Sequence, residues 1–234
     1  MRTIERFYEQ AGAAAVGEGY AVTLDGRPVK TPGRGDLVVP TRLLGEALAA
    51  EWAAQEETVK PHSMPLTAIA CTAIDVARPQ RAELVQGITA YAETDCICYW
   101  QEDHAALAER QRRHWQPLLD WLALTYDARL NVTTGILPAA QPPEALNALT
   151  RAVESFDAMG LAAVSCATGA TGSLVIALAL AEGRIGADEA FEAAELERTV
   201  QIEEWGDDVE AAKLRAAVRT DLEAAERFLA LLSA

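Results

Sequence analysis

The residues best suited to chemistry are few in this chain of 234 residues. Three histidines, His62, His104 and His114, stand too far apart to indicate a metal cluster or a catalytic triad. Cys96 and Cys98 form a closely spaced pair, but no second pair follows to complete a zinc site. We therefore expect no metal, no cofactor and no catalytic constellation, and we expect the cysteines to be structural thiols in a reducing compartment.

A glycine-containing run suggests a second kind of chemistry, phosphate binding. It lies inside an uncharged segment, Leu161 to Ala181, which is long enough to cross a bilayer. Its centre, Thr168 to Ser173, is polar and broken by glycine, and Ser173 is a good helix N-cap. No lysine follows Gly172, as a phosphate loop requires. We expect two buried helices joined by a turn, no nucleotide and no membrane insertion.

The segment from Ala187 to Val209 predicts one amphipathic helix. At 100° per residue its apolar stripe comprises Phe191, Ala194, Ile202, Trp205 and Val209. Glu195 and Arg198 fall within that stripe and, three residues apart, can form an ion pair. Leu196 and Val200 lie on the opposite side, so the helix must be covered on two sides or expose one. The pattern favours either an ion pair at the edge of a core or a partner-binding surface.

The elements before this helix fall into two parts. Residues 1–78 predict a small β-rich domain, because alternating apolar residues precede Asp25-Gly26, a type I′ hairpin signal. A helix that begins near Thr41 then carries Trp52 on its apolar face. We expect Trp52, Asp25 and Gly26 to be structural residues that support the joint between the two domains.

Residues 79–234 predict an all-helical domain. Apolar residues recur at helical spacing from Leu84 to Ala92, from Gln111 to Leu122, from Leu146 to Phe156 and from Val218 to Leu232. Gly160 is expected to end the third of these helices, and Asn131 to Pro143 to form a connection with a short extended piece. The fold class is therefore α+β, with a small N-terminal β-rich domain followed by an all-helical C-terminal domain.

The charge balance restricts the partners. The net charge of −15 argues against nucleic acid and against anionic membrane surfaces, which bind clustered Lys and Arg. A cationic or apolar protein partner remains open. The N-terminal sequence MRTIERFYEQ lacks the apolar run of a signal peptide and the Arg- and Ser-rich character of a transit peptide. We expect a cytoplasmic protein.

Several short motifs stand in order along nearly the whole chain. They are Leu24-Asp25-Gly26-Arg27-Pro28-Val29-Lys30-Thr31-Pro32, Glu51-Trp52-Ala53-Ala54-Gln55, Met64-Pro65-Leu66-Thr67, Thr72-Ala73-Ile74-Asp75, Thr94-Asp95, Gln111 with Trp115, Leu118-Leu119-Asp120-Trp121, Gly172-Ser173-Leu174, and Gln201 with Trp205-Gly206. Together they resemble the motifs of the ATP12-type chaperones, which assist ATP synthase assembly by binding the unassembled alpha subunit. The sequence departs from the family pattern at Arg198 and Trp100.

The resemblance implies a two-domain bacterial chaperone that works without ATP. It would hold the ATP synthase alpha subunit until the beta subunit replaces it, and we expect it to be a monomer. The candidate partner-binding residues are Glu195, Glu197, Gln201 and Trp205.

Two alternatives remain. One is an enzyme that acts on a small molecule in a cleft between the domains, near acidic residues such as Asp75, Asp95 and Glu197. The other is a purely structural adaptor.

Overall fold

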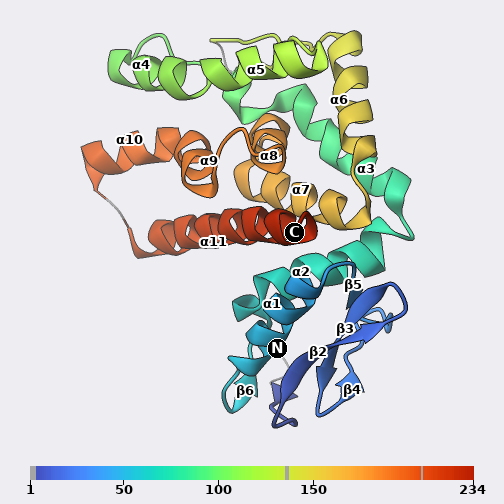
Figure 1. Ribbon diagram of the computed structural model, residues 1–234. Helices are drawn as coiled ribbons and strands as arrows, with labels where there is room; N and C mark the ends of the chain where they lie inside the picture. The colour runs from blue at the N-terminus through green and yellow to red at the C-terminus, as the bar shows by residue number, and fades with distance from the viewer. Residues whose placement is uncertain (1–3, 135–136, 207) are drawn as a thin grey trace. The chain divides into compact units, whose positions relative to one another are not determined.

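The computed structural model describes residues 4–134, 137–206 and 208–234, which form two compact units (Figure 1). The first unit takes the chain up to Arg81 together with Ala158–Ala163 and Arg227–Ala234. The second takes Ala82–Asp157 and Val164–Glu226. Small sheets lie near the N-terminus and helices make up the remainder, which confirms the α+β class. The division into 1–78 and 79–234 stays a prediction.

The first unit contains all the named strands in the described residues and two α-helices. The strands are β1 (Ile4–Glu5), β2 (Ala11–Val16), β3 (Gly19–Leu24), β4 (Arg27–Pro28), β5 (Val38–Val39) and β6 (Thr58–Val59), and the α-helices are α1 (Arg42–Ala53) and α2 (Pro65–Thr72). Strands β2, β3 and β4 pair in that order and antiparallel, β5 pairs with β3, and β1 pairs with β6. Short helical turns cover Pro61–Ser63 and Ala73–Ala77.

The turn between β3 and β4 is the one that the sequence predicts. Asp25 and Gly26 have φ values of 49° and 76°, as a two-residue type I′ turn requires. The carboxylate of Asp25 also accepts hydrogen bonds from the backbone N–H of Gln10, at 2.8 Å, and of Glu9, at 3.1 Å. Asp25 therefore shapes the hairpin and also holds the chain that enters β2.

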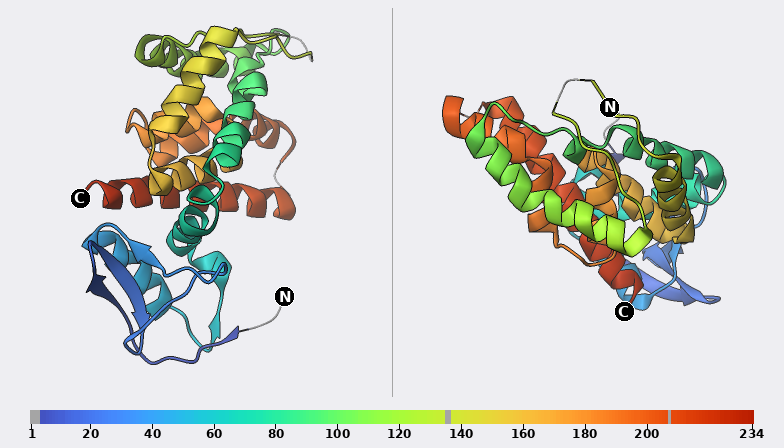
Figure 2. Two further views of the ribbon diagram at one scale, coloured as in Figure 1. Left: turned by 90° about the vertical axis from the view of Figure 1, so that its right-hand side faces the viewer. Right: turned by 90° about the horizontal axis from the view of Figure 1, so that it is seen from above.

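Helix α1 covers one face of this sheet (Figure 2). Thr41 is its N-cap, because its hydroxyl accepts a hydrogen bond from the N–H of Leu44 at 3.2 Å. Leu44 and Leu48 are fully buried. Gly45 allows close packing, since a Cβ there would lie 3.0 Å from the Cβ of Tyr20. The sheet and the helix together form the core of the first unit.

Carboxylates from two of the sequence motifs hold other segments of the first unit in place. Glu51 accepts hydrogen bonds from the N–H of Leu66 and of Thr67, each at 2.8 Å, and so caps the start of α2. Asp75 accepts hydrogen bonds from the Thr31 hydroxyl, at 2.6 Å, and from the N–H of Gly33, at 2.7 Å. These motif residues act as structural acceptors inside one unit.

The helices that follow α2 range in length from 8 to 24 residues. They are α3 (Arg81–Thr89), α4 (Ala105–His114), α5 (Gln116–Tyr126), α6 (Pro143–Ser155), α7 (Ala158–Thr171), α8 (Leu174–Ala181), α9 (Ala187–Ala194), α10 (Leu196–Trp205) and α11 (Val209–Leu232). Ala90–Thr94 and Cys96–Cys98 form short 3₁₀ turns.

The predicted pair of helices around Gly172 and Ser173 is confirmed. Helix α7 ends at Thr171, Gly172 has a φ of 68°, and the Ser173 hydroxyl accepts a hydrogen bond from the N–H of Ile176 at 3.0 Å. Among the described residues, no helix is both long and apolar enough to span a bilayer.

Three boundary predictions are wrong. The helix predicted from Gln111 to Leu122 is interrupted at Trp115, between α4 and α5. Gly160 lies inside α7, because α6 already ends at Ser155, where Phe156 turns the backbone to an extended conformation. The single helix predicted from Ala187 to Val209 is broken at Glu195 and ends before Gly206, whose φ is 86°.

Parts of three further predictions lie outside the described residues. Residues 1–3 belong to the N-terminal segment, 135–136 to the predicted connection before α6, and 207 to the predicted long helix.

Candidate functional site

The candidate partner-binding helix α10 is fixed to α4 and its neighbours by two buried side chains. Gln111 donates from Nε2 to the Glu197 carboxylate at 3.0 Å, and its Oε1 accepts a hydrogen bond from the N–H of Gln101 at 2.8 Å. The indole N–H of Trp115 donates to the carbonyl of Ala193 at 2.8 Å. Gln111 and Trp115, which the sequence marks as one motif, therefore determine where α9 and α10 lie.

One ion pair and one hydrogen bond, both half-exposed, lie farther along the same contact. Arg110 on α4 binds the Glu203 carboxylate with two nitrogens, at 3.0 and 2.7 Å. His104 Nδ1 accepts a hydrogen bond from the N–H of Leu107, so its Nε2 carries the hydrogen and donates to Glu204 at 2.6 Å. Such exposed pairs add little stability, but they occupy the acidic side chains at the end of α10.

Glu195 sits at the break between α9 and α10 and is buried. Its Oε2 lies 3.3 Å from Nε of Arg215 and 3.6 Å from Nε of Arg198. The predicted pair with Arg198 is therefore present, and a nearer cation on α11 accompanies it. Glu195 therefore has a structural role, since it contacts Arg215 on α11 and Arg198 on α10. A contact of Glu195 with a partner protein stays a prediction.

Glu197 is half-buried beneath the Gln111 amide. Burial raises the pKa of its carboxyl, and the hydrogen bond from Gln111 opposes that shift. A helical projection places Glu197 off the apolar stripe, on a polar side of the helix, but the structure buries half of this side chain. Glu197→Lys would therefore place an ammonium group against the amide donor of Gln111. A partner-binding role of Glu197 likewise stays a prediction.

Gln201 and Trp205 face solvent, and the Trp205 side chain is 78% exposed. Val209 and Leu214, at the start of α11, are exposed as well. Within α10 the predicted apolar stripe consists of Ile202, which is half-buried, and exposed Trp205, whereas Leu196 and Val200, on the other side, are buried. Of the four candidates, Gln201 and Trp205 are free to touch another protein.

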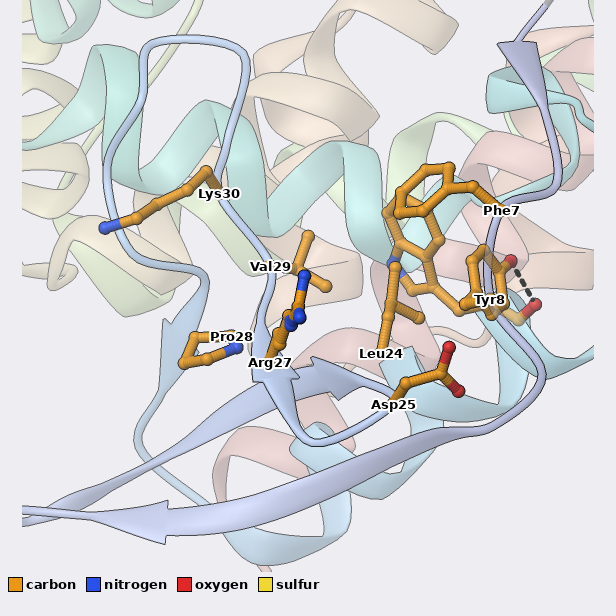
Figure 3. A pocket seen from close by; sticks show the side chains of 9 residues that line it. Phe7, Tyr8, Leu24, Asp25, Arg27, Pro28, Val29 and Lys30 are labelled. Carbon is orange, nitrogen blue, oxygen red and sulfur yellow. Dashed lines mark hydrogen bonds between the residues drawn. The ribbon is translucent and has the colours of Figure 1, made fainter.

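The first unit contains a hollow that the sequence reasoning missed (Figure 3). Its volume is about 580 Å³, and most of its lining comes from the first sequence motif. The lining residues are Phe7, Tyr8, Leu24, Asp25, Arg27, Pro28, Val29, Lys30 and Trp52. One feature of the sequence could have indicated the hollow. The motif continues past the turn into Arg27 and Pro28, two exposed residues that the hairpin geometry does not require.

Three aromatic side chains form one wall of this hollow. The ring centroids of Phe7 and Tyr8 lie 5.4 Å apart, and those of Tyr8 and Trp52 lie 5.9 Å apart, both edge to face. The Tyr8 hydroxyl donates to the Trp52 carbonyl at 2.8 Å, and burial raises its pKa. The indole nitrogen of Trp52 is buried and has no hydrogen-bond partner among the described residues.

Trp52 lies at the end of α1 and is half-buried, and its support of a domain joint stays a prediction. We expect Trp52→Ala to lower the free energy of unfolding by about 3 kcal/mol, the lower end for a truncated aromatic, because part of the ring faces solvent. Urea unfolding would measure this change. Trp52→Phe, the control, keeps a ring against Tyr8 and should lose less. An unchanged midpoint for Trp52→Ala would contradict the expectation.

The three acidic residues named for the enzyme alternative each lie in a different environment. Asp75 holds the Thr31–Gly33 turn, Glu197 accepts from Gln111, and Asp95 is fully buried. Within the described ranges, no group of three or more His, Cys, Asp or Glu side chains is arranged to hold a metal ion.

A family model and two of the similar known proteins point to one family. The family model described as ATP12 chaperone protein matches residues 5–123. The crystal structure of Atp12 from Paracoccus denitrificans has a TM-score of 0.90 and 36% identity, and the match covers 98% of each chain. The structure of the Atu1473 protein from Agrobacterium tumefaciens has a TM-score of 0.91 and 37% identity, covering 97% of this chain and 86% of that one. Protein atp12, mitochondrial, of Schizosaccharomyces pombe is 24% identical over 87% of this chain and 74% of its own length.

Proposed function

This chain belongs to the ATP12 chaperone family, and we propose that it assists the assembly of ATP synthase by binding the unassembled alpha subunit. The chaperone masks the subunit interface of the alpha subunit, works without ATP, and leaves when the beta subunit takes its place. It acts as a monomer in the bacterial cytoplasm. Family membership supports the class of activity, and the surface of the second unit supports the location of the contact.

The exposed indole of Trp205 is the observation that supports a partner contact on α10. A tryptophan that is 78% exposed leaves a large apolar area in water, and tryptophan is among the residues that most often dominate binding interfaces. Exposed Val209 and Leu214 follow it along the chain, and Gln201 precedes it by one helical turn. An apolar centre with polar residues around it matches the composition of a protein–protein interface.

The test is the double variant Gln201→Ala, Trp205→Ser in an alpha-subunit aggregation assay. Light scattering would report how much chaperone is needed to keep the purified alpha subunit soluble. We expect the double variant to need roughly thirtyfold more protein, because an aromatic hot spot contributes about 2 kcal/mol to binding. Its unfolding midpoint should match the wild type, since both side chains are exposed.

Leu124→Ser is the matched control, because Leu124 is an exposed apolar residue on α5 of the same unit. It should protect the alpha subunit as well as the wild type does. Full protection by the Gln201→Ala, Trp205→Ser protein would move the binding surface away from α10. Failure of the wild type itself to protect the alpha subunit at stoichiometric amounts would refute the proposed function.

A further inference from the structure

The hollow in the first unit has the size and lining of a binding site. Its volume of about 580 Å³ falls within the range of roughly 300–1,000 Å³ that is usual for small ligands and buried side chains. Phe7, which closes one side, is 71% exposed, so most of its ring is left in water even though one edge contacts Tyr8. The indole N–H of Trp52, one of the lining residues, is buried and has no hydrogen-bond acceptor among the described residues.

A single free cation stands against this aromatic wall. Among the described residues, the Arg27 side chain makes no ion pair and no hydrogen bond, although the chain has 35 acidic and only 20 basic residues. Figure 3 shows the Arg27 side chain beside Val29, with Phe7 and Tyr8 on the other side of the hollow. Lys30 is already paired with Asp36 at 2.6 Å. The Arg27 guanidinium can therefore form a strong bidentate ion pair with a carboxylate of a ligand.

The backbone around the hollow limits how a ligand can be held. Pro28 has no N–H and stands in the edge strand β4, which prevents an added strand from forming a regular ladder there. The Asp25 carboxylate is held by the N–H groups of Glu9 and Gln10 and would repel additional negative charge. A ligand is therefore recognised by its side chains, and it carries one negative group rather than several.

We propose that this hollow binds a short extended segment of a client protein, in which an aromatic or long aliphatic side chain has a carboxylate beside it. The apolar side chain lies against Phe7, Tyr8 and Trp52, and the carboxylate pairs with the Arg27 guanidinium. A nucleotide fits less well, because its phosphates need several cations or N–H donors and would face Asp25. The identity of the client rests on the proposed function, whereas the chemistry of the site does not.

The probe is a fluorescein-labelled hexapeptide with blocked ends, in which a central phenylalanine is followed by a single aspartate. Fluorescence polarisation would measure its affinity for the full chain. We expect saturable binding that weakens about tenfold or more when the peptide carries lysine in place of the aspartate, or alanine in place of the phenylalanine. Equal affinity for the original and the changed peptides, or no saturable binding, would overturn the proposal.

Variants of the chaperone test the same pairing from the other side. Arg27→Glu should abolish peptide binding, and Phe7→Ser should weaken peptide binding about tenfold. The control, Lys60→Glu, makes the same kind of charge change at an exposed residue outside the hollow and should leave peptide binding unaltered. Equal binding by Arg27→Glu and Lys60→Glu would overturn the proposal. Displacement of the peptide by millimolar ATP, with direct ATP binding, would identify a nucleotide site instead and would also overturn it.

The aggregation assay separates this inference from the proposed function. Loss of both peptide binding and alpha-subunit protection in Arg27→Glu supports a client segment in the hollow. If Arg27→Glu loses the peptide but protects the alpha subunit fully, the hollow does not serve this client, although the chaperone function stands. If the wild type binds the peptide without protecting the alpha subunit, the chemistry of the site is supported and the proposed function fails.

Discussion

Asp95→Ala is expected to lower the free energy of unfolding by about 3–5 kcal/mol at pH 5. The Asp95 side chain is fully buried, and its two oxygens accept hydrogen bonds from the N–H of Ile97, at 3.3 Å, and of Val175, at 3.1 Å. The Ser173 hydroxyl bonds to the same carboxyl group. Alanine leaves these buried donors without an acceptor, and each one costs about 1–3 kcal/mol.

The destabilisation should depend on pH. Burial raises the pKa of Asp95 from 3.8 to about 6, although hydrogen bonds from Ser173 and from backbone N–H groups oppose the rise. The folded protein therefore holds this proton more tightly than the unfolded chain does. The stability that this group contributes is complete below pH 4 and is lost as the pH rises through 6. Between pH 5 and pH 7.5 the cost of Asp95→Ala should shrink by about 1 kcal/mol.

Urea unfolding at both pH values measures the effect, and Asp103→Ala is the control. Asp103 is exposed, so its loss should change stability by no more than about 0.5 kcal/mol. Asp95→Asn should recover only part of the loss, because its amide offers one acceptor oxygen where the carboxylate offers two. A cost for Asp95→Ala that grows with pH would show that the pKa shift runs in the other direction.

Trp115→Ala is the second large effect, with an expected loss of about 3–5 kcal/mol in the free energy of unfolding. The indole is 2% exposed, and its N–H is bonded to the Ala193 carbonyl. Truncation removes a large buried ring and leaves that carbonyl without its partner. Trp115→Phe keeps most of the packing and loses only the hydrogen bond, so it should cost roughly 1–2 kcal/mol.

Chemical unfolding followed by circular dichroism checks this prediction. Trp205→Ala serves as the matched control, since it removes the same side chain from an exposed position and should leave the midpoint unchanged. If both tryptophan variants unfold at the wild-type midpoint, the Trp115 indole does not anchor α9.

Local chemistry explains which features the sequence could predict. The Asp25-Gly26 turn and the Ser173 cap depend on residues within three positions of each other, so their types suffice. The break at Glu195 depends on Arg215, twenty residues later, and on the Trp115 bond to Ala193. A helical projection assumes continuous geometry and cannot include such distant partners.

The hollow was beyond sequence reasoning for a related reason. Its aromatic wall combines residues at positions 7, 8 and 52, and its cation comes from β4, the strand that follows the Asp25-Gly26 turn. The motif pattern identified these segments individually. Only their packing around β3 and α1 brings Phe7, Trp52 and Arg27 to one place, and the family resemblance carried no information on that arrangement.

The wide spacing of the buried polar contacts in the second unit has a consequence during synthesis on the ribosome. Asp95, Gln111 and Trp115 bond to groups that follow them by 80, 86 and 78 residues. At about 5–20 residues per second, these side chains wait roughly 4–17 seconds for their partners to be made. Through that interval the nascent chain exposes the polar and apolar groups that later lie between α4, α8 and α10. A chaperone built this way is itself, while it is being translated, a polypeptide in need of protection.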